Sequence, residues 1–209
     1  MGRYLGSVCR LCRREGTQLM LKGSRCLSPK CAVTKRKSPP GERPKKRLGK
    51  LSDFGVELRE KQKVKRMYGL GEKQFYLTFL KSDRKAGKTG DNLLIALERR
   101  LDNVILKSRF ASSRAQSRQL INHGHFLVNG KKVNIPSFVV REGDLIEART
   151  KSKNLAVIRD GLKNISRQGV PSWLEVDENE VKSKVLTIPN REDIQVPANE
   201  QLIVEYYSK

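Results

Sequence analysis

The sequence lacks the features of a membrane-spanning, secreted or catalytic protein. Its longest apolar run, residues 93–97, is far shorter than the roughly 20 residues that cross a bilayer. The N-terminus carries Arg3 and Arg10 and has no apolar stretch typical of a secretory signal. His123 and His125, the two histidines, have no nucleophile or acid at a catalytic spacing, and the chain has neither a P-loop nor a GxGxxG motif. We therefore expect a cytoplasmic protein with no membrane partner, no catalytic activity and no small-molecule substrate.

Acidic residues are scarce. The 209 residues contain 44 Lys and Arg against 22 Asp and Glu, a formal net charge of +22. Residues 1–50 carry +13 of this charge, whereas residues 171–209 carry −4. A chain this basic repels itself when compact, so that it favours a polyanion as partner. Nucleic acid is the predicted polyanion, and the acidic C-terminal segment is expected to face protein or solvent.

Cysteine is confined to residues 9–31, where a C-x2-C motif is followed after thirteen residues by C-x4-C. A disulfide needs an oxidising compartment, and a redox dithiol uses only one pair of thiols. A tetrahedral metal site uses all four, as in zinc ribbons and knuckles. We predict one Zn2+ held by four thiolates, with an iron–sulfur cluster as the alternative because this ligand set suits both. The predicted ligands are Cys9, Cys12, Cys26 and Cys31.

The region around these thiols has too few large apolar side chains to fold alone. Ordering one residue costs ~1–2 kcal/mol of conformational entropy, whereas zinc in a small thiolate site supplies about 10–16 kcal/mol. Six Lys or Arg between the first and last cysteine keep the zinc-bound stretch positive. Residues 34–50 add eight Lys or Arg and three Pro, a composition that is disordered alone and orders on RNA. The sequence therefore predicts a zinc-clipped arm that faces RNA.

Three helices are predicted after the arm, and together they form a small helical domain. The first spans residues 52–69, from a serine cap to a glycine, and needs a partner because its apolar face is weak: Phe54, Leu58 and Tyr68. The second spans residues 71–87 and carries the pair Phe75 and Phe79. The third spans residues 89–106, with apolar residues at 3-4-3 spacing: Leu94, Leu97, Leu101 and Val104.

Residues 112–149 are the most informative block. Ser113 and Gln116 form a capping box at the start of a helix of about ten residues, which ends at Gly124. A short strand over residues 126–128 then reaches Asn129-Gly130, a strong signal for a two-residue hairpin. On the helix, two arginines lie four residues apart, a spacing that suits adjacent phosphates. These are Arg114 and Arg118, with Asn122 one turn later and Lys131 and Lys132 on the hairpin.

Five segments, in order along the chain, resemble the bacterial ribosomal protein S-four family of the small subunit. They are GRYLGSVCRLCRREG, LREKQKVKRMYG, LERRLDNV, SRAQSRQLINHGHFLVNGKKVNIPS and IPNREDIQVPANEQLIVEYYS. The fourth is the RNA-binding module named after this family, which also occurs in pseudouridine synthases, tyrosyl-tRNA synthetases and a heat-shock RNA binder. The four cysteines match the zinc-binding members. One departure is Lys107-Ser108-Arg109 in place of Arg-Leu-Gly, which puts an arginine where the family has a glycine.

The resemblance implies an α+β fold made of three parts. These are a zinc-clipped N-terminal arm, a small all-helical domain, and an RNA-binding domain with helices packed on a small, mainly antiparallel sheet. The expected arm is residues 1–50. The expected helical domain is residues 51–95, with the C-terminal segment of about 190–209 packing back on it. The expected RNA-binding domain is residues 96–189, with the module at about 99–163.

The resemblance also implies a non-enzymatic primary binder of 16S ribosomal RNA in its 5′ domain that nucleates small-subunit assembly. It implies contacts with ribosomal protein S-five and other small-subunit proteins, an influence on translational accuracy, and basic residues along the mRNA entry path. The alternative is an RNA-modifying or heat-shock RNA-binding protein that uses the same module. The predicted RNA-binding residues are Arg3, Arg10, Arg13, Arg14, Lys22, Arg25, Lys30, Arg43, Lys45, Lys46, Arg47, Arg59, Lys63, Lys107, Arg114, Arg118, Asn122, His123, Lys131 and Lys132.

Overall fold

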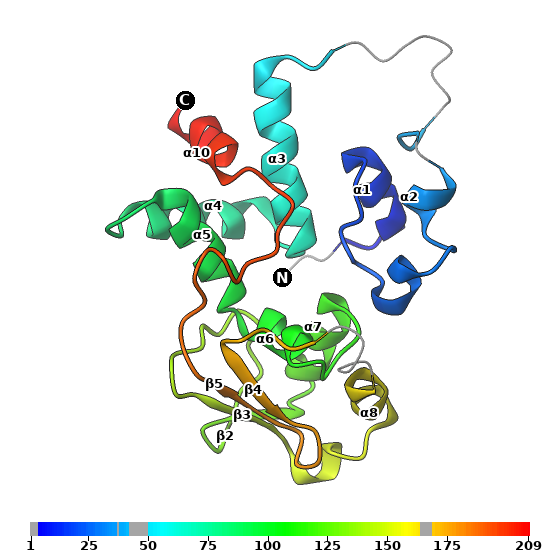
Figure 1. Cartoon of the computed structure of the whole chain (residues 1–209), viewed down its shortest axis with the longest axis vertical. Helices are drawn as coiled ribbons and strands as arrows, with labels where there is room; N and C mark the ends of the chain where they lie inside the picture. The colour runs from blue at the N-terminus through cyan, green and yellow to red at the C-terminus, as the bar shows by residue number, and fades with distance from the viewer. Residues whose placement is uncertain (1–3, 37, 42–49, 164–168) are drawn as a thin grey trace. The chain divides into compact units, whose positions relative to one another are not determined.

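The computed structural model describes residues 4–36, 38–41, 50–163 and 169–209 (Figure 1). The chain divides into two compact units: unit 1 comprises residues 1–93 and 196–209, and unit 2 comprises residues 94–195. The arm and the helical region, expected as separate domains, thus lie in one unit with the C-terminus. Within the described ranges, no helix combines the length and the apolar character that a membrane span requires.

The arm of unit 1 consists of short helical turns. They are α1 (Val8–Glu15), the 3-10 helix η1 (Gly23–Leu27) and α2 (Ala32–Lys35). α1 ends at Gly16, whose φ of 68° is left-handed, a conformation that glycine adopts at little cost. In the described part of the arm, the buried apolar side chains are one leucine and three thiols: Leu19, Cys12, Cys26 and Cys31. The arm therefore has almost no hydrophobic core of its own.

The helices predicted over residues 52–69 and 71–87 are confirmed. They are α3 (Asp53–Met67) and α4 (Glu72–Asp83), and α5 (Thr89–Glu98) follows them. Ser52 Oγ accepts a hydrogen bond from the Gly55 amide at 3.2 Å, which caps α3. Phe75 and Phe79 are buried as expected. Their rings lie 6.3 Å and 4.7 Å from the ring of Tyr207 on the C-terminal helix α10 (Glu200–Ser208).

The buried face of α3 is only partly the predicted one. Phe54 is 55% exposed, whereas the charged residues Glu57 and Lys61 are buried. The Lys61 ammonium lies 2.6 Å from Glu72 Oε1 and 4.4 Å from the ring centroid of Tyr206 on α10. A buried lysine is tolerated because a carboxylate and an aromatic face replace its water. α10 is therefore the partner that the weakly amphipathic α3 requires.

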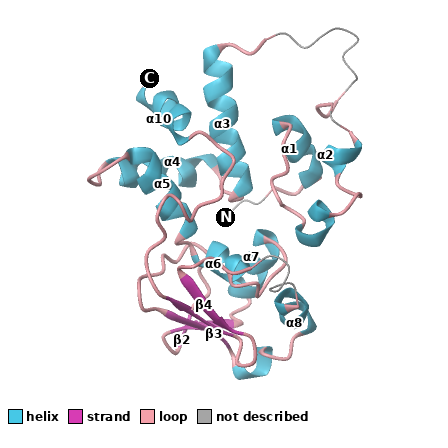
Figure 2. Ribbon diagram, in the orientation of Figure 1, coloured by secondary structure: helices cyan, strands magenta, loops and turns pink. Residues whose placement is uncertain are grey.

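Unit 2 is an α+β unit whose helices pack on a five-stranded antiparallel sheet (Figure 2). The strands are β1 (Phe126–Val128), β2 (Lys131–Lys132), β3 (Leu145–Ala148), β4 (Leu174–Asp177) and β5 (Lys182–Val185), in the order β2-β1-β3-β5-β4. The helices are α6 (Leu101–Lys107), α7 (Arg114–Asn122) and α8 (Ala156–Leu162). Trp173, the one tryptophan of the sequence, lies in the shared core and is 2% exposed. The antiparallel sheet and the α+β class are confirmed.

The single helix predicted over residues 89–106 is wrong. α5 ends at Glu98 and α6 begins at Leu101, and between them Arg100 is extended, with a φ of −71° and a ψ of 137°. At this break the backbone pairs with a distant segment, since the Leu101 amide donates to the Phe138 carbonyl at 2.8 Å. The apolar spacing continues across the break, so the periodicity alone does not reveal it. Tertiary pairing here overrides local helix propensity.

Most local signals around α7 and the hairpin are confirmed. Ser113 Oγ accepts a hydrogen bond from the Gln116 amide at 3.3 Å and so caps α7. The predicted capping box is shifted by one residue, because Gln116 Oε1 accepts from the Ser112 amide at 2.6 Å and not from that of Ser113. Gly124, with a φ of 71°, follows the end of α7. Asn129 and Gly130 have φ values of 50° and 74°, which fit a type I′ turn between β1 and β2. Each of these features depends on neighbouring residues alone.

Arg109 occupies the left-handed position after α6, with a φ of 63°. The Phe110 amide donates to the Ile105 carbonyl, and the Arg109 amide to the Leu106 carbonyl, each at 3.1 Å. This is the Schellman motif, and α3 and α7 end in it with a glycine at the same position. A left-handed arginine costs ~1–2 kcal/mol. A hydrogen bond from Arg109 Nε to the Gly169 carbonyl at 3.0 Å offsets part of this cost.

Candidate RNA interface and thiol site

The two arginines predicted to bind phosphate lie on α7 and are held by side chains of α6. Arg114 Nε donates to Asn103 Oδ1 at 3.0 Å, and Arg118 Nε donates to Asp102 Oδ2 at 2.7 Å. Both arginines are half-buried. α6 therefore fixes the direction in which each guanidinium group points.

Asp102 is the buried centre of this network, with a side chain that is 2% exposed. Arg100 donates to both of its oxygens, from Nε at 3.2 Å and from Nη2 at 2.9 Å. One carboxylate thus holds a buried arginine and the half-buried Arg118. Asn103 is fixed in turn, because its Nδ2 donates to Glu98 Oε2 at 2.5 Å. Arginines held in this way lose less conformational entropy when they bind a phosphate than free side chains do.

The sequence interpretation did not include Asp102 and Asn103 in the site. They lie in LERRLDNV, which was interpreted as part of one continuous amphipathic helix. The sequence did contain a signal for their role. Asp102 and Asn103 interrupt the apolar residues 101–105, and the whole stretch is buried. Because buried polar groups in proteins have hydrogen-bond partners, such a pair indicates a polar network. What the sequence does not show is that these partners are the arginines of the next helix.

Four more predicted RNA-binding residues are exposed at the end of α7 and on β2. They are Asn122, His123, Lys131 and Lys132. Lys132 lies against Gly124, so that a Cβ atom added to this glycine would be 2.2 Å from Lys132 Cε. Gly124 therefore does more than end the helix, because the lack of a side chain lets the lysine lie over the helix end.

Lys107 belongs to the α6 side of the same region. It is half-buried. Burial lowers the pKa of its ammonium group, the carboxylate of Glu98 opposes this shift, and Arg114 and Arg109 add to it. Lys107 thus lies within the charged network behind α7, and it contributes less exposed charge than the hairpin lysines.

The arm presents most of its predicted RNA-binding cations to solvent. The exposed residues are Arg10, Arg14, Lys22, Arg25 and Lys30. Arg13 is different, because its guanidinium group donates to the carbonyls of Ser38 and Pro39, each at 3.0 Å. Arg13 therefore ties α1 to the chain that follows α2. Five predicted residues lie outside the described residues: Arg3, Arg43, Lys45, Lys46 and Arg47.

Arg59 and Lys63 on α3 each have an acidic partner within unit 1. Arg59 Nη1 lies 3.3 Å from Oε1 of Glu15 at the end of α1, and Lys63 pairs with Glu60. Arg66, which was not predicted, contacts the same oxygen of Glu15. Burial raises the pKa of the Glu15 carboxyl, and Arg66 and Arg59 oppose this shift. These pairs join the arm to α3, and a phosphate at Arg59 or Lys63 would share the cation with a carboxylate.

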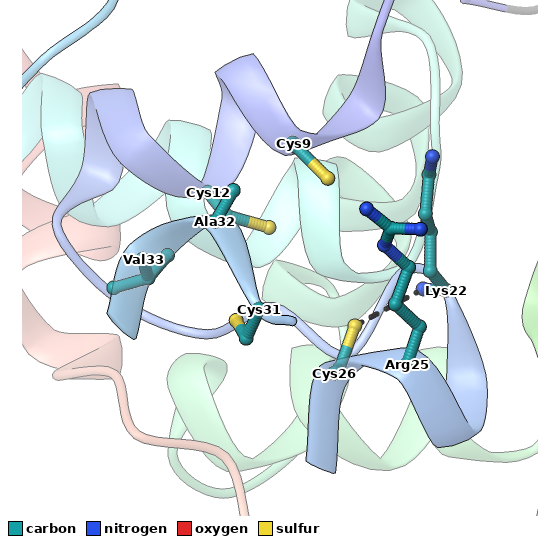
Figure 3. A pocket seen from close by; sticks show the side chains of 8 residues that line it. All are labelled: Cys9, Cys12, Lys22, Arg25, Cys26, Cys31, Ala32 and Val33. Atoms are coloured by element: carbon teal, nitrogen blue, oxygen red, sulfur yellow. Dashed lines mark hydrogen bonds between the residues drawn. The ribbon is translucent and has the colours of Figure 1, made fainter. Parts of the chain in front are cut away.

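The four cysteines line one pocket (Figure 3). The four side chains come from α1, from η1 and from the residue that precedes α2. All four are free thiols. The Lys22 amide donates to Cys26 Sγ at 3.3 Å. The pocket is also lined by Lys22, Arg25, Ala32 and Val33.

This donor set fits a four-thiolate metal site in residue type, and its four members line one pocket. Within the described ranges, however, no group of three or more Cys, His, Asp or Glu side chains is arranged to hold an ion. Burial raises the pKa values of Cys12 and Cys26. Burial acts in the same direction on Cys31, but its pKa is lowered because the amides of Val33 and Thr34 donate to its sulfur. To hold one ion, the four sulfur atoms have to close around it.

Comparison with known proteins gives matches along the whole chain. Residues 3–98 match the Ribosomal protein S4/S9 N-terminal domain, and residues 99–146 match the S4 domain. The chain is 57% identical to the small ribosomal subunit protein uS4 of Desulfatibacillum aliphaticivorans, 54% to that of Desulforapulum autotrophicum and 55% to that of Thermodesulfovibrio yellowstonii. Each of these comparisons spans 209 residues and 100% of both chains. The chain therefore belongs to the uS4 family of small ribosomal subunit proteins.

Proposed function

We propose that this chain is a structural component of the small ribosomal subunit in the cytoplasm, where it binds 16S ribosomal RNA. The observation that carries the proposal is the arginine pair on α7, held in place by Asp102 and Asn103 beside exposed hairpin lysines. Fixed guanidinium groups one helical turn apart match neighbouring phosphates of an RNA backbone. The uS4 family is structural and not enzymatic.

The finer role rests on family membership. The chain binds the 5′ domain of 16S ribosomal RNA early and nucleates small-subunit assembly. It contacts ribosomal protein S-five and other small-subunit proteins, influences translational accuracy, and lies along the mRNA entry path. The strongly basic arm supports this role, because its exposed cations suit a folded RNA surface. Full-length similarity to uS4 proteins favours this role over an RNA-modifying or heat-shock protein with the same module.

The proposal includes one Zn2+ held by Cys9, Cys12, Cys26 and Cys31, with an iron–sulfur cluster as the alternative. When bound, the metal supplies a structural cross-link and no reaction chemistry. The support is the presence of all four cysteines in one pocket and the scarcity of other buried apolar side chains in the described part of the arm. The cross-link holds α1, η1 and α2 together, and it thereby positions the arm's exposed cations.

Replacing both arginines of α7, Arg114→Ala with Arg118→Ala, tests the RNA-binding proposal. We expect the affinity for 16S ribosomal RNA to fall by at least about tenfold, and the slope of log K against log[salt] to become shallower by about 1–2, since two phosphate contacts are lost. The measurement is a filter-binding or fluorescence titration at several salt concentrations.

A matched control removes the same charge elsewhere. Arg84 and Lys85 are exposed beyond the end of α4 in unit 1, and Arg84→Ala with Lys85→Ala also removes two positive charges. Fluorescence of the buried Trp173 verifies that unit 2 of each variant is folded. An unchanged affinity and salt slope for the α7 variant, or equal losses for both variants, would refute the assignment of α7 as an RNA-binding helix.

A further inference from the structure

A second group of cations follows β3 in unit 2 and was not among the predicted RNA-binding residues. The segment of residues 149–153 contains Arg149, Lys151 and Lys153, and its centre forms the 3-10 helix η2 (Thr150–Ser152). Arg149 and Lys151 are exposed, and Lys153 is half-buried. Three cations in five residues on a short ordered turn form a dense local positive charge.

This segment is attached to the turn at the end of α7. The Arg149 amide donates to the His125 carbonyl at 2.9 Å, and Arg149 Nη1 donates to the Gly124 carbonyl at 3.4 Å. Ser152 is buried, and its Oγ lies 2.9 Å from Nδ1 of His125. The Ser152 and Lys153 amides both donate to the Arg149 carbonyl, which closes the turn on itself. Arg149 thus lies at the same glycine that Lys132 covers, and the rest of the segment is held at His125.

The contact at His125 positions the segment and adds no charge of its own at neutral pH. Burial lowers the pKa of His125, and His123 and Arg149 lower it further. The imidazole is therefore neutral near pH 7, and it shares one hydrogen bond with the Ser152 hydroxyl.

The charge of this segment is not neutralised within the described part of the chain, where no carboxylate pairs with Arg149, Lys151 or Lys153. Lysines on β5 provide a contrast. Lys182 pairs with Glu180 and lies opposite Glu147 and Asp177, and Lys184 lies opposite Glu175. Among its described residues, unit 2 thus places acids beside the lysines of β5 and none in an ion pair with the cations of residues 149–153.

We propose that Arg149, Lys151 and Lys153 form a second phosphate-binding surface, adjoining the one made by α7 and the β1–β2 hairpin. The inference rests on the proposed RNA-binding function and extends it. Its ligand is the sugar–phosphate backbone of folded RNA, because exposed cations without acidic partners favour a polyanion and no apolar side chain lies among them. An RNA strand that binds at the end of α7 continues across η2. The α7–hairpin surface and the surface of residues 149–153 therefore bind one RNA molecule.

The test compares two double variants of the full-length chain that remove the same charge. Lys151→Ala with Lys153→Ala removes two cations of η2, and Lys182→Ala with Lys184→Ala removes two balanced lysines of β5. We expect the η2 variant to bind 16S ribosomal RNA about tenfold more weakly, with a salt slope shallower by about 1–2, and the β5 variant to change much less. Arg149 is left in place because it also binds the Gly124 carbonyl.

Two readouts separate the possible failures. Trp173 fluorescence verifies that both variants keep a folded unit 2. If the unaltered chain prefers 16S over 23S ribosomal RNA and the η2 variant binds as tightly as the β5 variant, the second surface does not exist while the proposed function stands. If the unaltered chain shows no preference between the two RNAs, the proposed function fails, and the inference fails with it.

Discussion

From the proposed zinc site we expect that treatment with a zinc chelator unfolds the N-terminal arm and leaves unit 2 folded. In the described part of the arm, the only buried apolar side chain that is not a thiol is Leu19, so that little hydrophobic burial remains once the metal is removed. A structural zinc site contributes about 10–16 kcal/mol to folding, more than any other single interaction of such a segment. Glu15 then loses the ordered α1 that holds its carboxylate against Arg59 and Arg66.

Limited proteolysis with and without the chelator measures this effect. We expect rapid cleavage before α3 in the metal-free chain, while fluorescence of the buried Trp173 stays unchanged. Metal analysis of the purified chain, with one zinc expected per molecule, distinguishes zinc from iron and sulfide. The matched control is Cys26→Ser without chelator, which should give the same cleavage pattern. Identical proteolysis of the treated and untreated chains would contradict the zinc-clipped arm.

Replacement of Asp102 by alanine will destabilise unit 2 by about 3–5 kcal/mol, the usual cost of removing one partner from a buried ion pair. Arg100 is 5% exposed and would remain in the interior without its carboxylate. Arg118 would lose its contact with α6, so the RNA affinity of the variant should also fall. Urea unfolding followed by Trp173 fluorescence measures the stability of unit 2 directly.

An exposed ion pair supplies the control for Asp102→Ala. Asp160 and Lys163 form an ion pair at 3.0 Å with side chains that are 69% and 76% exposed. Asp160→Ala removes the same charge and should cost less than about 1 kcal/mol, because solvent screens exposed pairs. If Asp102→Ala and Asp160→Ala shift the unfolding midpoint equally, Asp102 is not the centre of a buried network.

The features that sequence analysis predicted correctly are those that neighbouring residues determine. The cap at Ser113, the glycine at the end of α7 and the Asn129-Gly130 turn each need only a few adjacent residues. The four cysteines line one pocket, as their clustering in the sequence suggests, and the metal predicted for them stays a prediction.

The features that sequence analysis missed depend on residues distant in the chain. The helix break at Arg100 is stabilised by pairing with residues 136–140, which the periodicity of residues 89–106 does not encode. Lys61 is buried because α10, far along the chain, supplies an aromatic face. β4 and β5 were not predicted either. β4 alternates apolar and polar residues over only four positions, and β5 has one apolar residue, Val185. They are strands because they pair with each other and because β5 pairs with β3.

Arg109 is a departure from the family resemblance at a position where the structure has a special backbone conformation. The family pattern has glycine there, and the chain keeps the left-handed conformation with an arginine. Sequence analysis noted this departure but predicted no conformation for it, since an arginine by itself does not indicate a positive φ. The hydrogen bond from Arg109 to the Gly169 carbonyl, sixty residues away, was not visible in the sequence.

The measurement that tests RNA recognition most directly is a competition titration of the full-length chain. A net charge of +22 ensures some binding to any RNA, so specificity and not affinity decides the question. The chain is titrated against naked 16S ribosomal RNA in moderately high salt, with 23S ribosomal RNA as competitor. Tight, saturable binding that survives an excess of competitor is the predicted result, since the α7 arginines are held in a fixed arrangement. Equal displacement by both RNAs would contradict it and would show that the basic surfaces act only as generic charge.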